Sequence, residues 1–89
     1  MSVRRRVVVH GRVQGVAFRD ATRRQASSRG VAGWVTNRSD GAVEAVFEGD
    51  EDAVRSMLEF VRAGPRAADV DRVEESSEEP EGLSSFDVR

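Results

Sequence analysis

The sequence predicts an α+β domain in which two helices lie on one face of a mainly antiparallel sheet. Two segments, from Phe18 to Gly30 and from Asp50 to Gly64, have the apolar spacing of helices, and the segments around them alternate as strands. Their order is strand, helix, strand, strand, helix, strand, followed by a short terminal strand. This order (βαββαβ plus one) contains two strand-helix-strand units. In each unit the connection between the two strands skips one position in the sheet, which a strand of the other unit fills, so the order predicts a ferredoxin-like sandwich.

Length and composition limit the chain to one small domain. Its 89 residues are 38% hydrophobic and 34% charged, so we expect a single domain over residues 1–89. No apolar run approaches the ~20 residues that span a bilayer, and the arginine-rich start lacks an apolar segment. We therefore expect a cytoplasmic protein with no membrane partner. The absence of cysteine excludes disulfides, thiolate nucleophiles and cysteine-based zinc sites.

Charge is unevenly distributed along the chain, although the net charge is only −2. Residues 1–38 carry nine arginines and one acidic residue, whereas residues 39–89 carry five arginines and fifteen acidic residues. The positive half would attract small anions over a screening length of about 8 Å at physiological salt. The alternative is a solvated surface on which folding mixes both signs, and the sequence leaves both open.

The first strand is predicted at residues 4–11, where Val7 and Val9 alternate with other residues and form an apolar face. The first helix has a weakly apolar stripe formed by Phe18, Ala21, Thr22, Gln25 and Ala26. Its opposite side carries Asp20, Arg23, Arg24 and Ser27. Gly30 ends the helix, because glycine suits the left-handed position just after a helix end.

The middle of the chain predicts a hairpin and a second helix. Strands at residues 32–38 and 42–48 are joined by a turn at Asp40-Gly41. Asp50 caps the following helix, and the acidic residues of its first turn interact favourably with the positive end of the helix dipole. Its apolar stripe consists of Val54, Met57, Leu58 and Val61. Gly64-Pro65 closes this helix.

The last third of the chain is less strongly patterned. Val70 and Val73 indicate a fourth strand near residues 69–75. The stretch from Glu74 to Gly82 is acidic and contains a proline, which is typical of a solvated loop. A short strand is expected from Ser84 to Val88.

Residues 11–19 have the composition of an anion-binding loop that leads into a helix. The two glycines allow backbone N–H groups to point inward together, and the helix start adds its free N–H groups at the same place. Arg19 adds a planar fork of donors that fits a phosphate or a carboxylate. A plain strand-to-helix turn with a solvated arginine has the same spacing, so the loop alone does not decide the function.

Two motifs in this order resemble the signatures of the acylphosphatase family. Residues 11–19 match G-x-V-Q-G-V-x-F-R, and residues 33–41 match G-W-V-x-N-x-x-D-G. The resemblance covers nearly the whole chain and weakens after about Pro65. One departure is Ala17, which stands where many members have glycine, and we expect it to stiffen the loop modestly.

The resemblance implies hydrolysis of small acyl phosphates, such as acetyl, carbamoyl or glyceroyl phosphate, to carboxylate and inorganic phosphate. It implies that Arg19 and the preceding backbone hold the phosphate, and that Asn37 orients the attacking water. The phosphate-binding positions are then Gly11, Arg12, Val13, Gln14, Gly15, Val16, Ala17 and Phe18. Without the resemblance, Asn37 before a hairpin would be interpreted as a turn residue.

The residue inventory suits such a reaction. The chain has no lysine for a phosphate loop, no cysteine and one histidine, His10, which lacks a histidine partner. An acyl phosphate loses a stable carboxylate, so its hydrolysis needs positioning and charge neutralisation more than acid catalysis. We therefore expect no metal and no cofactor, with inorganic phosphate acting as product and inhibitor.

Two other functions remain as alternatives. A nucleic-acid-binding module of the same fold would need aromatic side chains on the open face of its sheet, and the first and third strands offer only Phe47, on the apolar face. An accessory domain that handles carbamoyl phosphate within a larger protein is the second alternative. We expect a monomer that binds a small anion and no nucleic acid.

Overall fold

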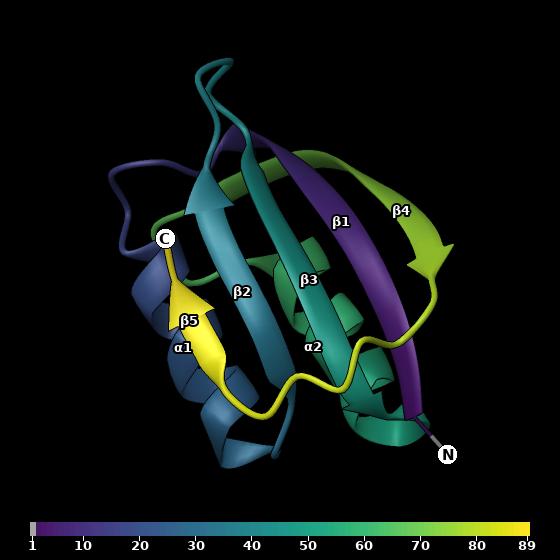
Figure 1. Cartoon of the computed structure of the whole chain (residues 1–89). Coiled ribbons are helices and arrows are strands. Elements are labelled where there is room, and N and C mark those ends of the chain that lie inside the picture. The colour runs from purple at the N-terminus through teal and green to yellow at the C-terminus, as the bar shows by residue number, and fades with distance from the viewer. Residues whose placement is uncertain (1) are drawn as a thin grey trace.

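The computed structural model describes residues 2–89 and has the predicted order of elements (Figure 1). Its five strands and two helices are β1 (Ser2–Arg12), α1 (Phe18–Ser28), β2 (Ala32–Asn37), β3 (Val43–Asp50), α2 (Glu51–Ala63), β4 (Asp69–Glu78) and β5 (Phe86–Val88). Among residues 2–89, no helix is long and apolar enough to cross a bilayer.

The strands form one sheet in the order β4-β1-β3-β2-β5. The pairs β1–β3, β1–β4 and β2–β3 are antiparallel, and the edge pair β2–β5 is parallel. Both helices lie behind the sheet in Figure 1, and its other face is open except where residues 79–85 cross it. The predicted ferredoxin-like sandwich is confirmed.

The core lies between the sheet and the two helices. Val7 and Val9 of β1 and Phe47 of β3 are fully buried on the covered face. From α2, the predicted stripe contributes Val54, Met57 and Val61, which are at most 1% exposed. Phe47 stacks against Phe86 of β5 with a centroid distance of 5.9 Å. The apolar periodicity therefore correctly identified the buried face of β1 and of α2, whereas in β3 Val46 and Glu48 of the face that was expected to be largely wet are also buried.

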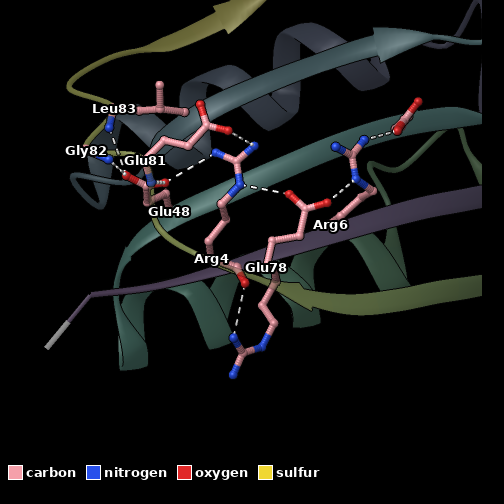
Figure 2. A network of polar contacts seen from close by, with 9 residues as sticks. Arg4, Arg6, Glu48, Glu78, Glu81, Gly82 and Leu83 are labelled. Carbon is pink, nitrogen blue, oxygen red and sulfur yellow. Dashed lines mark hydrogen bonds and ion pairs between the residues drawn. The ribbon is translucent and has the colours of Figure 1, made fainter.

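The prediction of a solvated loop from Glu74 to Gly82 was wrong for its first five residues, because β4 continues to Glu78, and holds for residues 79–82. The strand pairs with β1 as far as the register Arg4↔Glu78. Glu78 accepts from Arg4 Nε at 2.8 Å and from Arg6 Nε at 2.7 Å, which holds the acidic end of the strand against its neighbour (Figure 2). The last strand is also shorter than expected and begins only at Phe86.

Residues 79–85, which we call the strap, lead from β4 at one edge of the sheet to β5 at the other (Figure 1). The Glu48 carboxylate of β3 accepts 2.8 Å hydrogen bonds from three successive strap N–H groups, those of Glu81, Gly82 and Leu83. Burial acts to raise the pKa of Glu48, but these N–H donors and the guanidinium of Arg4 outweigh it and lower the pKa. Glu48 thus fixes the strap to the sheet (Figure 2).

Candidate active site

The loop between β1 and α1 has a backbone suited to binding an anion. Gly15 and Ala17 have φ angles of 74° and 59°, in the left-handed region. Backbone turns of this kind group N–H donors into concave nests. Ala17 is the N-cap of α1 and gives no side-chain cap, and the bond from Ala21 N to Ala17 O opens the helix. The first N–H groups of α1 therefore lack intrahelical partners and can face a ligand.

A cavity of about 390 Å³ lies beside this loop. It is lined by Val13, Gly15, Ala17, Phe18, Arg19, Asp20, Arg23, Asn37 and Val88. The fold thus brings Arg19, in the first turn of α1, and Asn37, the last residue of β2, to one cavity from distant positions in the chain.

Asn37 stands at the start of a well-fixed hairpin. Arg38 N donates to Ala42 O at 2.8 Å, and Ala42 N donates to the Asp40 carboxylate at 3.0 Å. The Ala42 N–H, with further help from Arg38, keeps the pKa of Asp40 below its ordinary value. These contacts assign the turn-forming role to Arg38, Asp40 and Ala42, while Asn37 lines the cavity.

Gln14 connects the loop to this hairpin. Its side-chain Nε2 donates to Arg38 O at 2.7 Å and to Ala42 O at 2.9 Å. These two carbonyls belong to the two ends of the hairpin turn, so one amide group fixes the turn against the loop that precedes α1. The contact keeps the Asn37 end of β2 at a constant position relative to the loop.

Arg19 is oriented by the far end of the chain. Its Nη1 donates to the backbone carbonyl of Arg89 at 2.9 Å, and the hydroxyl of Thr36 donates to the same oxygen at 3.3 Å. Arg89 N in turn donates to Val35 O at 2.8 Å. Arg89, the residue that follows β5, therefore holds the Arg19 guanidinium next to β2, the strand that ends in Asn37.

Four residues predicted for phosphate binding do not line the cavity. Gly11 belongs to β1 at a bulge, with φ of 129°, and a Cβ there would lie 2.2 Å from Asp69 O. Arg12 is exposed and its Nη2 pairs with Asp69 at 3.2 Å. Val16 packs against the core, and Gln14 holds the hairpin.

The cavity also contains three residues that sequence reasoning assigned no role in binding: Asp20, Arg23 and Val88. Arg23 follows Arg19 by four positions in α1, and residues four apart share a helix face. This spacing could have revealed Arg23. The position of Val88 depends on the parallel pairing of β5 with β2, for which the local sequence gives no signal.

The remaining candidate groups lie elsewhere. His10 Nε2 is 2.5 Å from the Glu74 carboxylate on β4, and this contact is the main reason that the pKa of Glu74 is lowered. Within residues 2–89, no three His, Cys, Asp or Glu side chains form a group that could hold a metal ion.

Comparisons with known proteins identify the family of this chain. The model of the family described as acylphosphatase matches residues 5–88. The chain is 53% identical over 87 residues to an acylphosphatase of Gloeobacter violaceus and 51% identical over 86 residues to one of Haloarcula marismortui, covering 98% and 97% of this chain and 94% of each relative. The crystal structure of acylphosphatase from Bacillus subtilis superposes with a TM-score of 0.94 at 39% identity, over 98% of both chains. The chain belongs to the acylphosphatase family.

Proposed function

We propose that this protein hydrolyses small acyl phosphates to a carboxylate and inorganic phosphate. The observation that carries the proposal is a cavity that Arg19, the start of α1 and Asn37 line together. Family membership supports the same activity. The substrate class is the mixed anhydride of a carboxylic acid and phosphoric acid, with acetyl, carbamoyl and glyceroyl phosphate as examples.

The reaction follows from the roles of these groups. The phosphoryl oxygens accept hydrogen bonds from backbone N–H groups of the loop and helix start and from the planar guanidinium of Arg19. Asn37 holds a water opposite the leaving group, since its amide can both donate and accept. The water oxygen bonds to phosphorus while the bond from phosphorus to the acyl oxygen breaks, and the electron pair leaves with the carboxylate. The water proton passes to the product phosphate or to solvent.

The proposed reaction needs no strong general acid, and Arg19 with the backbone donors supplies the charge neutralisation that it does need. A carboxylate is a stable leaving group at neutral pH, so the barrier depends chiefly on positioning and on neutralising the phosphoryl oxygens. We therefore propose a metal-independent enzyme that uses no cofactor, with inorganic phosphate binding at the same place as substrate and inhibiting competitively.

The proposal also includes a cytoplasmic monomer without a nucleic-acid partner. On the open sheet face, Trp34 has the guanidinium carbons of Arg6 and Arg89 at 5.4 and 4.7 Å from its ring centroid, which leaves little of the ring for stacking on bases. Phe47 is fully buried. Size-exclusion chromatography with light scattering tests the monomer, and a gel-shift assay with single-stranded RNA tests the expected lack of binding.

Release of inorganic phosphate tests the activity itself. Benzoyl phosphate, a generic acyl phosphate, is compared with p-nitrophenyl phosphate, a monoester whose leaving group is a phenolate. We expect rapid hydrolysis of benzoyl phosphate and negligible hydrolysis of the monoester. Equal rates would show a general phosphatase, and no release from either compound would overturn the proposal.

A further inference from the structure

The cavity is larger than one phosphoryl group requires. Its volume of about 390 Å³ lies within the range of roughly 300–1,000 Å³ that is typical of sites for whole small molecules. Beyond Arg19, the lining continues along α1 to Arg23 and across to Val88 on β5. The additional space is therefore bounded by a second cation and by an apolar side chain.

Arg23 lies one helical turn beyond Arg19, so both side chains project from the same face of α1. Arg23 Nη2 donates to one oxygen of Asp20 at 3.1 Å, and Arg24 Nε is 3.2 Å from the other oxygen. One carboxylate is thus shared by two guanidinium groups, which leaves net positive charge at this end of the cavity. The Arg23 side chain is 45% exposed, and only one of its five N–H groups is used by Asp20, so the others remain available to a ligand.

The cavity wall also includes three apolar residues, Val13, Phe18 and Val88. A methylene chain fits an apolar wall better than it fits water, because burial of each CH₂ is favourable. The cavity lining therefore combines two cations about one helical turn apart on α1 with apolar side chains that a short acyl chain can contact.

We propose that Arg23 forms a second anion subsite, which selects acyl phosphates whose short acyl chain ends in a carboxylate or a phosphate group. The inference rests on the proposed hydrolysis of acyl phosphates and adds the class of acyl group. Asp20 opposes this selection, because it competes with the ligand for the guanidinium and repels a second negative charge. Selectivity is therefore set by the balance between Arg23 and Asp20.

The test compares two substrates of equal chain length, succinyl phosphate with a free terminal carboxylate and butyryl phosphate without one. We expect the wild-type protein to have the higher kcat/KM for succinyl phosphate, mainly through a lower KM. Arg23→Gln should reduce the ratio of the two kcat/KM values about three- to tenfold, as expected for a hydrogen-bonded ion pair at a half-exposed site. Arg23→Lys should restore part of the ratio, and added salt should weaken it.

Two further variants separate this role from a general change in charge or folding. Asp20→Asn should raise the succinyl-to-butyryl ratio, because it releases Arg23 from its carboxylate partner. Arg29→Gln removes one positive charge at the other end of α1 and should leave the ratio at the wild-type value. A purely structural role for Arg23 would not produce opposite effects from the Arg23 and Asp20 substitutions.

The outcomes distinguish this inference from the activity on which it rests. If the wild-type protein hydrolyses both substrates but Arg23→Gln leaves their ratio unchanged, the second subsite is wrong and the acyl phosphate hydrolase remains. If the wild-type protein hydrolyses neither succinyl, butyryl nor benzoyl phosphate, the proposed function fails and the subsite fails with it.

Discussion

The Arg19 guanidinium is oriented by a contact with the protein that leaves most of its donors free for a ligand. Its Nη1 donates to Arg89 O, and the remaining N–H groups can reach the cavity. The forked arrangement of donors matches two phosphoryl oxygens, which a lysine ammonium cannot contact in the same way. Arg19 therefore combines charge with a fixed direction.

We expect Arg19→Ala to lower kcat/KM by about 10³-fold or more, in the range found for arginines that neutralise a transferring phosphoryl group. Arg19→Lys should recover little of this loss, because it keeps the charge but loses the fork. Steady-state kinetics with benzoyl phosphate measures both variants, and circular dichroism confirms that they are folded. A folded Arg19→Ala protein with substantial activity would remove Arg19 from the site.

Ala17 adopts a conformation that L residues avoid. Its φ of 59° lies in the left-handed region, where a Cβ costs roughly 1–2 kcal/mol. Glycine would relieve this cost, but it would also raise the conformational entropy of the unfolded chain, which destabilises the folded state by roughly 0.4–1 kcal/mol. On balance, Ala17→Gly should stabilise the protein by about 0.5–1 kcal/mol. Chemical denaturation measures the change.

The control for Ala17→Gly is Ala21→Gly, which lies inside α1 with an ordinary helical backbone. Glycine in a helix interior is less favourable than alanine by about 1 kcal/mol, so this variant should be less stable than wild type. If both substitutions destabilised the protein equally, the strain at Ala17 would be refuted.

At the scale of elements, the strap is attached through one buried carboxylate. Glu48 and Arg4 are each only 4% exposed, and Arg4 also pairs with Glu78 and Glu81. The attachment fixes the segment that leads into β5, and β5 is followed by Arg89, whose carbonyl orients Arg19. The strap thereby connects the polar network in Figure 2 with the cavity.

Acid should detach the strap. The pKa values of Glu48 and Glu78 in the folded protein lie below the ordinary value of 4.5. At pH values between the folded pKa and the ordinary pKa of these groups, the unfolded chain binds more protons than the folded chain. The stability from these groups is therefore complete above about pH 4.5 and is lost as the pH falls through the folded values. Thermal melts between pH 7 and pH 3 measure this loss.

Glu48→Gln should remove about 3 kcal/mol of stability at pH 7, because it leaves buried Arg4 without part of its compensation. It should also flatten the acid limb of the stability profile. Glu59→Gln on the exposed side of α2 is the matched control and should change neither quantity appreciably. A Glu48→Gln protein with the wild-type melting temperature and pH profile would refute the attachment.

The sequence predicted most elements because their apolar periodicity agrees with the face that each one buries. It failed at β4, where the residues after Val73 are polar and all but Glu78 are exposed, and only their pairing with β1 makes them a strand. It also missed Arg23, because the weak apolar stripe of α1 placed that residue on the solvent side. The contact of Arg89 with Arg19 joins positions 70 residues apart, which no local pattern reveals.

At the scale of the whole molecule, we expect activity without divalent metal. The acidic run at the start of α2 has another role, since Asp50 caps the helix by accepting from Asp52 N at 3.2 Å and Asp52 pairs with Arg55 at 3.4 Å. Dialysis against EDTA should therefore leave kcat and KM for benzoyl phosphate unchanged. Activity that disappears on dialysis and returns with magnesium would contradict a site built only from arginine, amide and backbone donors.

The central claim is that one cavity separates two tasks, with Arg19 holding the phosphoryl group and Asn37 aligning the water. If Asn37 acts only on the water, its contribution develops in the transition state and adds little to ground-state binding. Removing it should then lower kcat while sparing KM. Asn37→Asp should in addition weaken binding, through a repulsion that salt reduces.

The most direct measurement is the steady-state kinetics of Asn37→Ala with benzoyl phosphate, together with the inhibition constant of inorganic phosphate. The exposed Ser39→Ala variant of the same hairpin serves as the control. The account predicts a loss of about 10²–10⁴ in kcat, with KM and phosphate inhibition close to wild type. A folded Asn37→Ala protein with normal kcat, or one whose whole defect lies in KM, would contradict it.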